Sequence, residues 1–161
     1  MKPNLDIKEV QDAIIYTKEA IARVLGTLPR RLMKMQVWWS GIWILVKGKR
    51  PRLYKKSLFQ NHFVNFRKAN AASLTVSATS STEFWIKNPE AGTVNYVGYK
   101  VKDGKPRYEC GCKDFQEMRP AFKAPACKHI YAVLAQQGFG SIKESIAQHK
   151  AEFDARSALG I

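Results

Sequence analysis

The chain has 161 residues, of which 45% are hydrophobic. That is enough apolar material to build a core, which excludes a globally disordered protein. Its 27 Lys and Arg against 13 Asp and Glu give a net charge of +14. A field this positive attracts polyanions, meaning nucleic acid or an anionic membrane surface. The alternative is a basic protein without a polyanionic partner.

The N-terminal residues carry charges where a secretory signal has an apolar segment. The longest apolar run, Val37 to Val46, covers ten residues, whereas a membrane-spanning helix needs ~20. We therefore expect a soluble, intracellular and cytoplasmic protein. Its three cysteines are then expected to stay reduced rather than form disulfides.

Residues 5–28 predict one helix that begins at a capping box, Asp6 with Glu9, and ends near Gly26 and Pro29. Its apolar residues recur with a heptad-like period, interrupted by one polar residue, Thr17. This stripe comprises Ile7, Val10, Ile14, Ile21, Val24 and Leu28. It either packs on the core or binds a partner helix.

The segment from Ala20 to Thr82 contains no acidic residue but twelve Lys and Arg. Within it, Ile42–Val46 predicts a buried strand that is followed by a turn and a short strand or loop. Ser57 is suited to cap a helix that runs to about Ala72. His62 on this helix and His149 near the C-terminus lie on apolar faces, so we interpret both as satisfied core or interface histidines rather than as ligands of a second metal.

The second half of the chain is rich in strand signals, and we expect strands within 73–80, 82–86, 93–101 and 106–112. The sequence "KDGK" between the last two predicts a hairpin turn. Helices are expected from Lys128 to Gln137 and after Ser141, which forms a capping box with Glu144. On the last helix, Ile142, Ile146, His149 and Phe153 share one face.

All three cysteines and one of the three histidines lie close together in the sequence: Cys110, Cys112, Cys127 and His129. Residues i and i+2 of a strand point to the same side, and Gly111 lets the backbone curl between the first two cysteines. A fourteen-residue loop, 113–126, is long enough to bring the two pairs together. Three thiolates and one imidazole satisfy a closed tetrahedral zinc site, which is structural rather than catalytic.

Three other interpretations of these cysteines remain. One is a Cys–His nucleophile, which leaves two cysteines unexplained. Another is a redox pair, although such pairs normally have two intervening residues. The third is independent packing of buried thiols.

The motif "CGCKDF…ACKHIYAVL" resembles the SWIM zinc finger, whose pattern is Cys-x-Cys followed by Cys-x-His at the start of an apolar helix. The resemblance covers about residues 57–137 and is closest to a small stand-alone bacterial or phage-like member. Lys113 stands where bacterial members often carry proline. The resemblance implies one structural zinc in a β-hairpin and helix, and an association with DNA binding and protein–protein contacts.

Together these expectations give an α+β fold, with a small antiparallel sheet and a zinc-stapled hairpin and helix flanked by terminal helices. We expect four segments: an N-terminal amphipathic helix (1–29), a basic and aromatic strand and loop (30–56), a SWIM-like zinc domain (57–137) and a C-terminal helix (138–161).

The basic residues are the candidates for nucleic-acid contact, mainly with phosphates. Trp38, Trp39 or Tyr54 could stack on exposed bases, whereas Trp43, Ile44 and Leu45 are expected in the core. The predicted contacts are Arg30, Arg31, Lys47, Lys49, Arg50, Arg52, Lys55, Lys56, Lys113, Arg119, Lys123 and Lys128.

The sequence therefore favours a zinc-stabilised nucleic-acid-binding module, with DNA ahead of RNA as the ligand. The alternative is an adaptor or small subunit of a larger nucleoprotein complex, which binds a larger protein partner through the terminal helices. The sequence lacks paired carboxylates and a phosphate-binding glycine loop, so we do not expect an enzyme.

Overall fold

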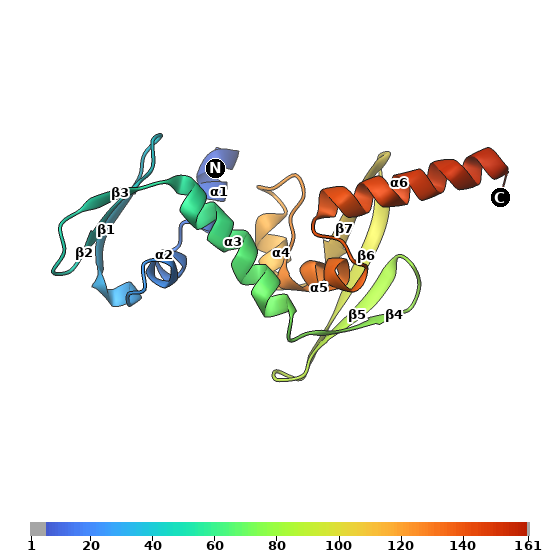
Figure 1. The fold of residues 1–161 in the computed structure, drawn as a ribbon, viewed down its shortest axis with the longest axis horizontal. Coiled ribbons are helices and arrows are strands. Elements are labelled where there is room, and N and C mark those ends of the chain that lie inside the picture. Colours follow the sequence, from blue (N-terminus) through green and yellow to red (C-terminus); the bar gives the residue numbers. More distant parts are fainter. Residues whose placement is uncertain (1–5, 161) are drawn as a thin grey trace, which may run out of the picture. The chain divides into compact units, whose positions relative to one another are not determined.

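The computed structural model describes residues 6–160, apart from the side chain of Phe153. The chain divides into two compact units, the N-terminal unit (residues 1–66) and the C-terminal unit (67–161), with the boundary inside helix α3, Lys56–Ala71. Each unit combines helices with one antiparallel sheet (Figure 1), which confirms the predicted α+β class.

The N-terminal unit is built on a three-stranded sheet of order β1-β2-β3. Its strands are β1 Leu32–Val37, β2 Ile42–Val46 and β3 Arg52–Tyr54. Alternate residues of β2 are buried, as expected for a strand with one face on a core. The buried core consists of Tyr16, Ile21, Ala22, Leu32, Ile42, Ile44, Val46 and Phe59.

The predicted single N-terminal helix is wrong, because the segment forms two helices, α1 Ile7–Ile15 and α2 Lys18–Val24. Thr17, the polar residue in the apolar stripe, is the N-cap of α2, and its hydroxyl accepts a hydrogen bond from the amide of Ala20. A threonine cap ends one helix and starts another, since its own backbone is extended. The stripe is not buried as one face, because Ile7 is 60% and Leu28 51% exposed. Residue 5 lies outside the described residues.

Asp6 caps α1 as predicted, with its carboxylate accepting from the amide of Lys8. After α2 a short 3-10 turn, Pro29–Arg31, leads into β1. The helix predicted to follow a Ser57 cap is α3, but Ser57 is not its cap, because α3 begins at Lys56 and contains Ser57 in its first turn.

Strand β2 is the predicted strand, but its partner β1 was not predicted. The turn between them lies inside the longest apolar run, at residues 38–41, so that hydrophobicity alone conceals it. Gly41 is required at this turn, because a Cβ there would lie 2.5 Å from the carbonyl oxygen of Tyr54 on β3. Trp43, Ile44 and Leu45 were all predicted to lie in the core. Ile44 is buried, but the prediction is wrong for Trp43 and Leu45, which are half-buried on the opposite face of the strand.

The C-terminal unit contains a four-stranded antiparallel sheet of order β4-β5-β6-β7. Its strands are β4 Thr75–Ala78, β5 Glu83–Asn88, β6 Thr93–Lys102 and β7 Lys105–Cys110. The hairpin of β6 and β7 turns at Asp103 and Gly104, both with positive φ, as the "DG" sequence predicts.

Three further helices belong to this unit: α4 Lys113–Met118, α5 Lys128–Gln136 and α6 Ile142–Leu159. Helix α5 buries Ile130, Val133 and Leu134, and Gly138 with φ of 81° ends it, as predicted. Ser141 is the N-cap of α6 and accepts a hydrogen bond from the amide of Glu144. Within residues 6–160, no helix has the length and apolar character needed to cross a membrane.

Candidate metal centre

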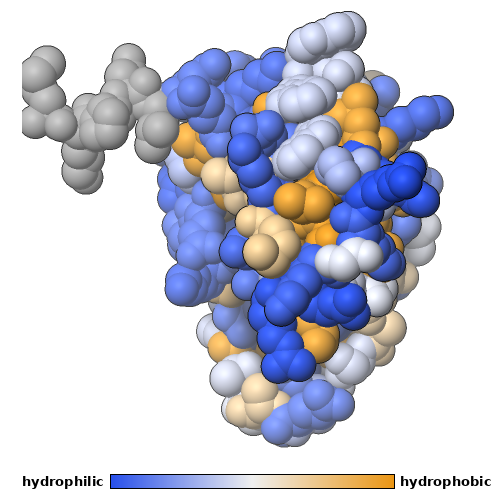
Figure 2. All heavy atoms as spheres, turned by 90° about the vertical axis from the view of Figure 1, so that its left-hand side faces the viewer, coloured by the Kyte–Doolittle hydropathy of each residue, from blue (hydrophilic) through white to orange (hydrophobic). Residues whose placement is uncertain are grey.

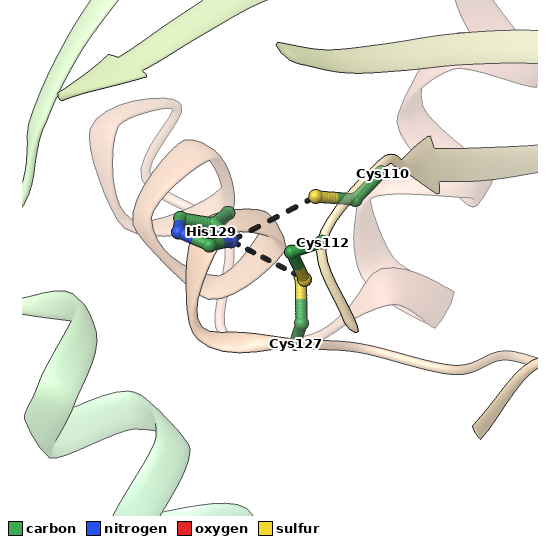
Figure 3. A group of neighbouring side chains, drawn as sticks. All are labelled: Cys110, Cys112, Cys127 and His129. Atoms are coloured by element: carbon green, nitrogen blue, oxygen red, sulfur yellow. Dashed lines mark hydrogen bonds between the residues drawn. The ribbon is translucent and has the colours of Figure 1, made fainter. Parts of the chain in front are cut away.

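The side chains of Cys110, Cys112, Cys127 and His129 converge on one point in the C-terminal unit (Figure 3). Their sulfur and imidazole nitrogen atoms all lie within 4.8 Å of one another. Nδ1 of His129 is 3.7 Å from Sγ of Cys110 and 3.8 Å from Sγ of Cys127. The four candidate ligands are therefore brought together as their spacing predicts.

Each ligand is held at the end of a regular element. Cys110 is the last residue of β7 and Cys112 is the N-cap of α4, where its sulfur accepts a hydrogen bond from the amide of Phe115. Cys127 is the N-cap of α5, and His129 lies in the first turn of that helix. The site thus joins one strand end to two helix N-termini, whose dipoles stabilise thiolate charge.

The distances fit a tetrahedral ion. Zn–S bonds of about 2.3 Å and Zn–N bonds of about 2.0 Å place ligand atoms ~3.6–3.8 Å apart in a tetrahedron, close to the two distances measured from His129. Cys110, Cys127 and His129 are buried and Cys112 is half-buried. This Cys3His cluster could hold one zinc ion, and four protein ligands leave no coordination position for water. The arrangement therefore suits a structural zinc.

When no metal is bound, the three neighbouring thiols change one another's pKa through hydrogen bonds. Hydrogen bonds from Cys110 and Cys127 lower the pKa of Cys112. Donation to Cys112 raises the pKa of Cys110 to about 11, and hydrogen bonding with Cys110 and burial raise that of Cys127. Zinc binding has to displace protons from these two thiols, because only the thiolate is a ligand.

Asn95 on β6 extends the site beyond its ligands. Its side-chain amide lies 3.2 Å from Nε2 of His129, on the side of the ring away from the sulfurs. The amide atom at this distance is Nδ2, which can only donate, whereas a histidine that binds metal through Nδ1 carries its proton on Nε2. In the zinc-bound state the Asn95 amide therefore has to turn over, so that its oxygen accepts the hydrogen bond from Nε2. Local sequence spacing does not indicate this contact, because Asn95 lies on β6 and none of the four ligands belongs to that strand.

Two predicted details of the connection are wrong. The segment 113–126 is not a loop throughout, because α4 occupies its first six residues. Gly111 is not needed to curl the chain: it is not among the residues of positive φ, and a Cβ there would meet no atom within 4 Å. Cys112 makes the turn instead, by capping α4.

The twelve basic residues predicted to contact nucleic acid fall into two groups. Eight of them, Arg30 to Lys56, belong to the N-terminal unit and four, Lys113 to Lys128, to the C-terminal unit. All are exposed except Lys56 and Lys128, which are half-buried. Lys113 forms an ion pair of 3.7 Å with Glu117.

His62 and His149 both make ring contacts, but the prediction that both are satisfied histidines is wrong for His149. His62 accepts a hydrogen bond from Nε of Arg23, and its pKa is lowered by burial. The ring of His149 lies 4.4 Å from that of Tyr99, and its Nε2 is buried without a hydrogen-bond partner among the described residues. The face predicted for Phe153 lies outside the described side chains.

Residues 93–138 match the family model of the SWIM zinc finger. This segment runs from β6 to the end of α5 and contains all four ligands and Asn95. The comparisons with curated proteins and with solved structures gave no match.

Proposed function

We propose, starting from the SWIM zinc finger that residues 93–138 form, that this protein is a zinc-stabilised nucleic-acid-binding module. Zinc holds the C-terminal unit together, and basic side chains contact the phosphate backbone. In this proposal the metal is structural, and the protein is not an enzyme.

The uneven charge of the two units carries the proposal. Residues 1–66 contain 13 Lys and Arg against four Asp and Glu, a net charge of +9. All four acidic residues precede Ala20. Among the described residues, no carboxylate lies within 4.0 Å of any cation from Arg30 to Lys56, so these charges are not neutralised by ion pairs. Uncompensated cations at this density favour a polyanionic ligand.

The salt dependence of binding tests the proposal. Each phosphate neutralised releases counterions, so log K falls with log of the salt concentration by about 0.7–0.9 per phosphate contact. The ligands are a fluorescein-labelled 12-base-pair DNA duplex and the corresponding single strand. We expect the affinity of the full-length, zinc-loaded protein for its preferred ligand to fall steeply as KCl is raised from 50 to 300 mM. Fluorescence anisotropy measures both affinity and slope.

A matched pair of triple variants separates specific contacts from net charge. Lys47→Gln, Lys49→Gln and Arg50→Gln remove three exposed cations from the turn after β2, and we expect affinity and salt slope to fall. Lys87→Gln, Lys102→Gln and Lys105→Gln remove the same charge from exposed positions of the C-terminal unit. Equal losses in both variants, or affinity independent of salt in the wild type, would contradict the proposal.

A second candidate function, an adaptor within a larger complex, is favoured by helix α6. From Lys150 to Gly160 every residue whose side chain is described is exposed, and Figure 1 shows this half of α6 extending past β6 and β7. A half-helix whose described side chains are all exposed is available for a partner protein. Co-purification from cells with and without nuclease distinguishes the functions, because a protein partner stays bound after nuclease treatment only if the contact is direct.

A further inference from the structure

The three-stranded sheet of the N-terminal unit has one face on the core and one facing outward. Ile42, Ile44 and Val46 of β2 are buried, so Trp43 and Leu45 point to the other side. Their cross-strand neighbours on that side are Gln36 and Lys34 on β1 and Leu53 on β3. We call the surface made by Lys34, Gln36, Trp43, Leu45 and Leu53 the outer sheet face.

Tryptophans dominate one end of this face. The ring of Trp38 stacks on that of Trp43, with centroids 6.3 Å apart and an angle of 18° between the planes. Trp38 is 43% exposed, and Trp39, beside it in the turn, is 92% exposed. A side chain as large as tryptophan is costly to leave in water. The structure therefore presents flat aromatic surface where folding does not require it.

Cations lie at both ends of the outer sheet face. Nζ of Lys34 lies 5.9 Å from the centre of the Trp43 ring. The turn at the far end of β2 adds Lys47, Lys49 and Arg50, and Lys55 follows β3 at the tryptophan end, all of them exposed. Figure 2, seen from the end at which the three strands lie in Figure 1, shows hydrophobic residues (orange) between strongly hydrophilic ones (dark blue). No acidic residue occurs in the chain between Ala20 and Thr82.

From this combination we propose that the outer sheet face binds single-stranded nucleic acid, with bases stacking on Trp38 and Trp39 and phosphates contacting the bordering cations. This inference rests on the proposed function and adds the site and the strandedness of the ligand. A duplex hides the flat faces of its bases in its own stack, whereas a single strand exposes them. An acidic protein would use the cations, but only scattered aromatic or arginine side chains could stack on the tryptophans, whereas every nucleotide of a single strand carries a planar base.

The test compares full-length Trp39→Ala and Trp38→Ala proteins with the wild type, using a fluorescein-labelled 12-nucleotide oligo-dT. Loss of one stacked base is expected to weaken binding about 5- to 150-fold. The salt slope should remain unchanged, because a tryptophan neutralises no phosphate. Trp38→Phe, which keeps an aromatic ring, should recover most of the affinity.

Trp85→Ala is the matched control, since Trp85 is a 50% exposed tryptophan on β5 of the other sheet, and we expect it to bind oligo-dT as the wild type does. Trp39 makes so little contact with the protein that its replacement cannot unfold the sheet, and thermal melting verifies this for each variant.

The outcomes separate this inference from the proposed function. If Trp38→Ala and Trp39→Ala bind oligo-dT as tightly as the wild type while the Lys47, Lys49 and Arg50 variant binds weakly, the proposed function stands and the stacking site is wrong. A duplex bound more tightly than the single strand also overturns the stacking site. If the wild type binds neither nucleic acid, both proposals fail.

Discussion

His129 uses its two ring nitrogens for different purposes. Nδ1 faces the sulfurs of Cys110 and Cys127, and Nε2 faces the amide of Asn95. When the Asn95 amide presents its oxygen in place of Nδ2, a hydrogen bond from Nε2 fixes the tautomer that leaves Nδ1 free for a metal and also fixes the angle of the ring. Asn95 is therefore a positioning residue for the metal site.

Replacing Asn95 with leucine should weaken zinc binding about 10- to 100-fold, the usual effect of removing such a partner. Asn95→Asp keeps an acceptor for the Nε2 proton and should retain most of the affinity. Competition with a chromophoric zinc chelator measures both. Equal zinc affinity of the leucine variant and the wild type would show that packing alone orients the ring.

At this scale the sequence predicted the ligands but not their support. Cys-x-Cys and Cys-x-His are local spacings, and they identify the four residues without knowledge of the fold. Asn95 reaches His129 only because β6 lies in the same sheet as β7, a relation between distant residues. The role given to Gly111 was wrong because a cysteine that caps a helix turns the chain without needing a glycine.

At the scale of elements, α3 is attached to the zinc finger by an ion pair. In the C-terminal unit, the guanidinium of Arg67 donates to both carboxylate oxygens of Asp114, at 2.6 and 3.0 Å. Arg67 is 15% exposed and Asp114, in the first turn of α4 after Cys112, is 42% exposed. The pair thus connects the last turns of α3 to the helix that Cys112 caps.

Arg67→Ala should lower the free energy of unfolding by about 1–3 kcal/mol, because it leaves a partly buried carboxylate without its charged partner. Arg67→Lys keeps the charge but loses the two-pronged geometry, so its effect should be smaller but measurable. Chemical denaturation of the zinc-loaded protein gives both values. An alanine variant as stable as the wild type would mean that this ion pair does not hold α3.

The elements that the sequence analysis missed were missed for separate physical reasons. The break between α1 and α2 depends on Thr17. A single polar residue in an apolar stripe is compatible with one continuous helix, so only the capping hydrogen bond of Thr17 reveals the break. Strand β1 was missed because Trp38 and Trp39 continue the apolar run into the turn, so that the Ser40-Gly41 turn signal of the β1–β2 hairpin was not recognised. The hairpin of β6 and β7 was predicted correctly because Asp-Gly is such a turn signal.

At the scale of the whole molecule, the two units have separate sources of stability. The N-terminal unit has its own hydrophobic core around Ile21, Ile42 and Phe59. The C-terminal unit buries Cys110 and Cys127 among its core residues, and a structural zinc can contribute an apparent ~10–16 kcal/mol to the folding of such a domain. Total composition and net charge cannot indicate this division, since both are totals over the chain. The acid-free stretch from Ala20 to Thr82 did indicate where the positive charge is concentrated.

Removing zinc with a strong chelator should therefore unfold the C-terminal unit and spare the N-terminal sheet. Hydrogen exchange measured by mass spectrometry should show a loss of protection across residues 93–138 and little change across 32–54. Added zinc should restore protection. Equal loss of protection in both segments would contradict independent stabilisation of the units.

The central claim, that Cys110, Cys112, Cys127 and His129 hold one structural zinc, is tested most directly by native mass spectrometry of the purified protein. We expect about one zinc ion per chain, as one tetrahedral site requires. The Cys127→Ser and His129→Ala proteins should carry no zinc, and their C-terminal unit should be unfolded. A Cys127→Ser or His129→Ala protein that keeps a full zinc ion and its native fold would contradict the claim.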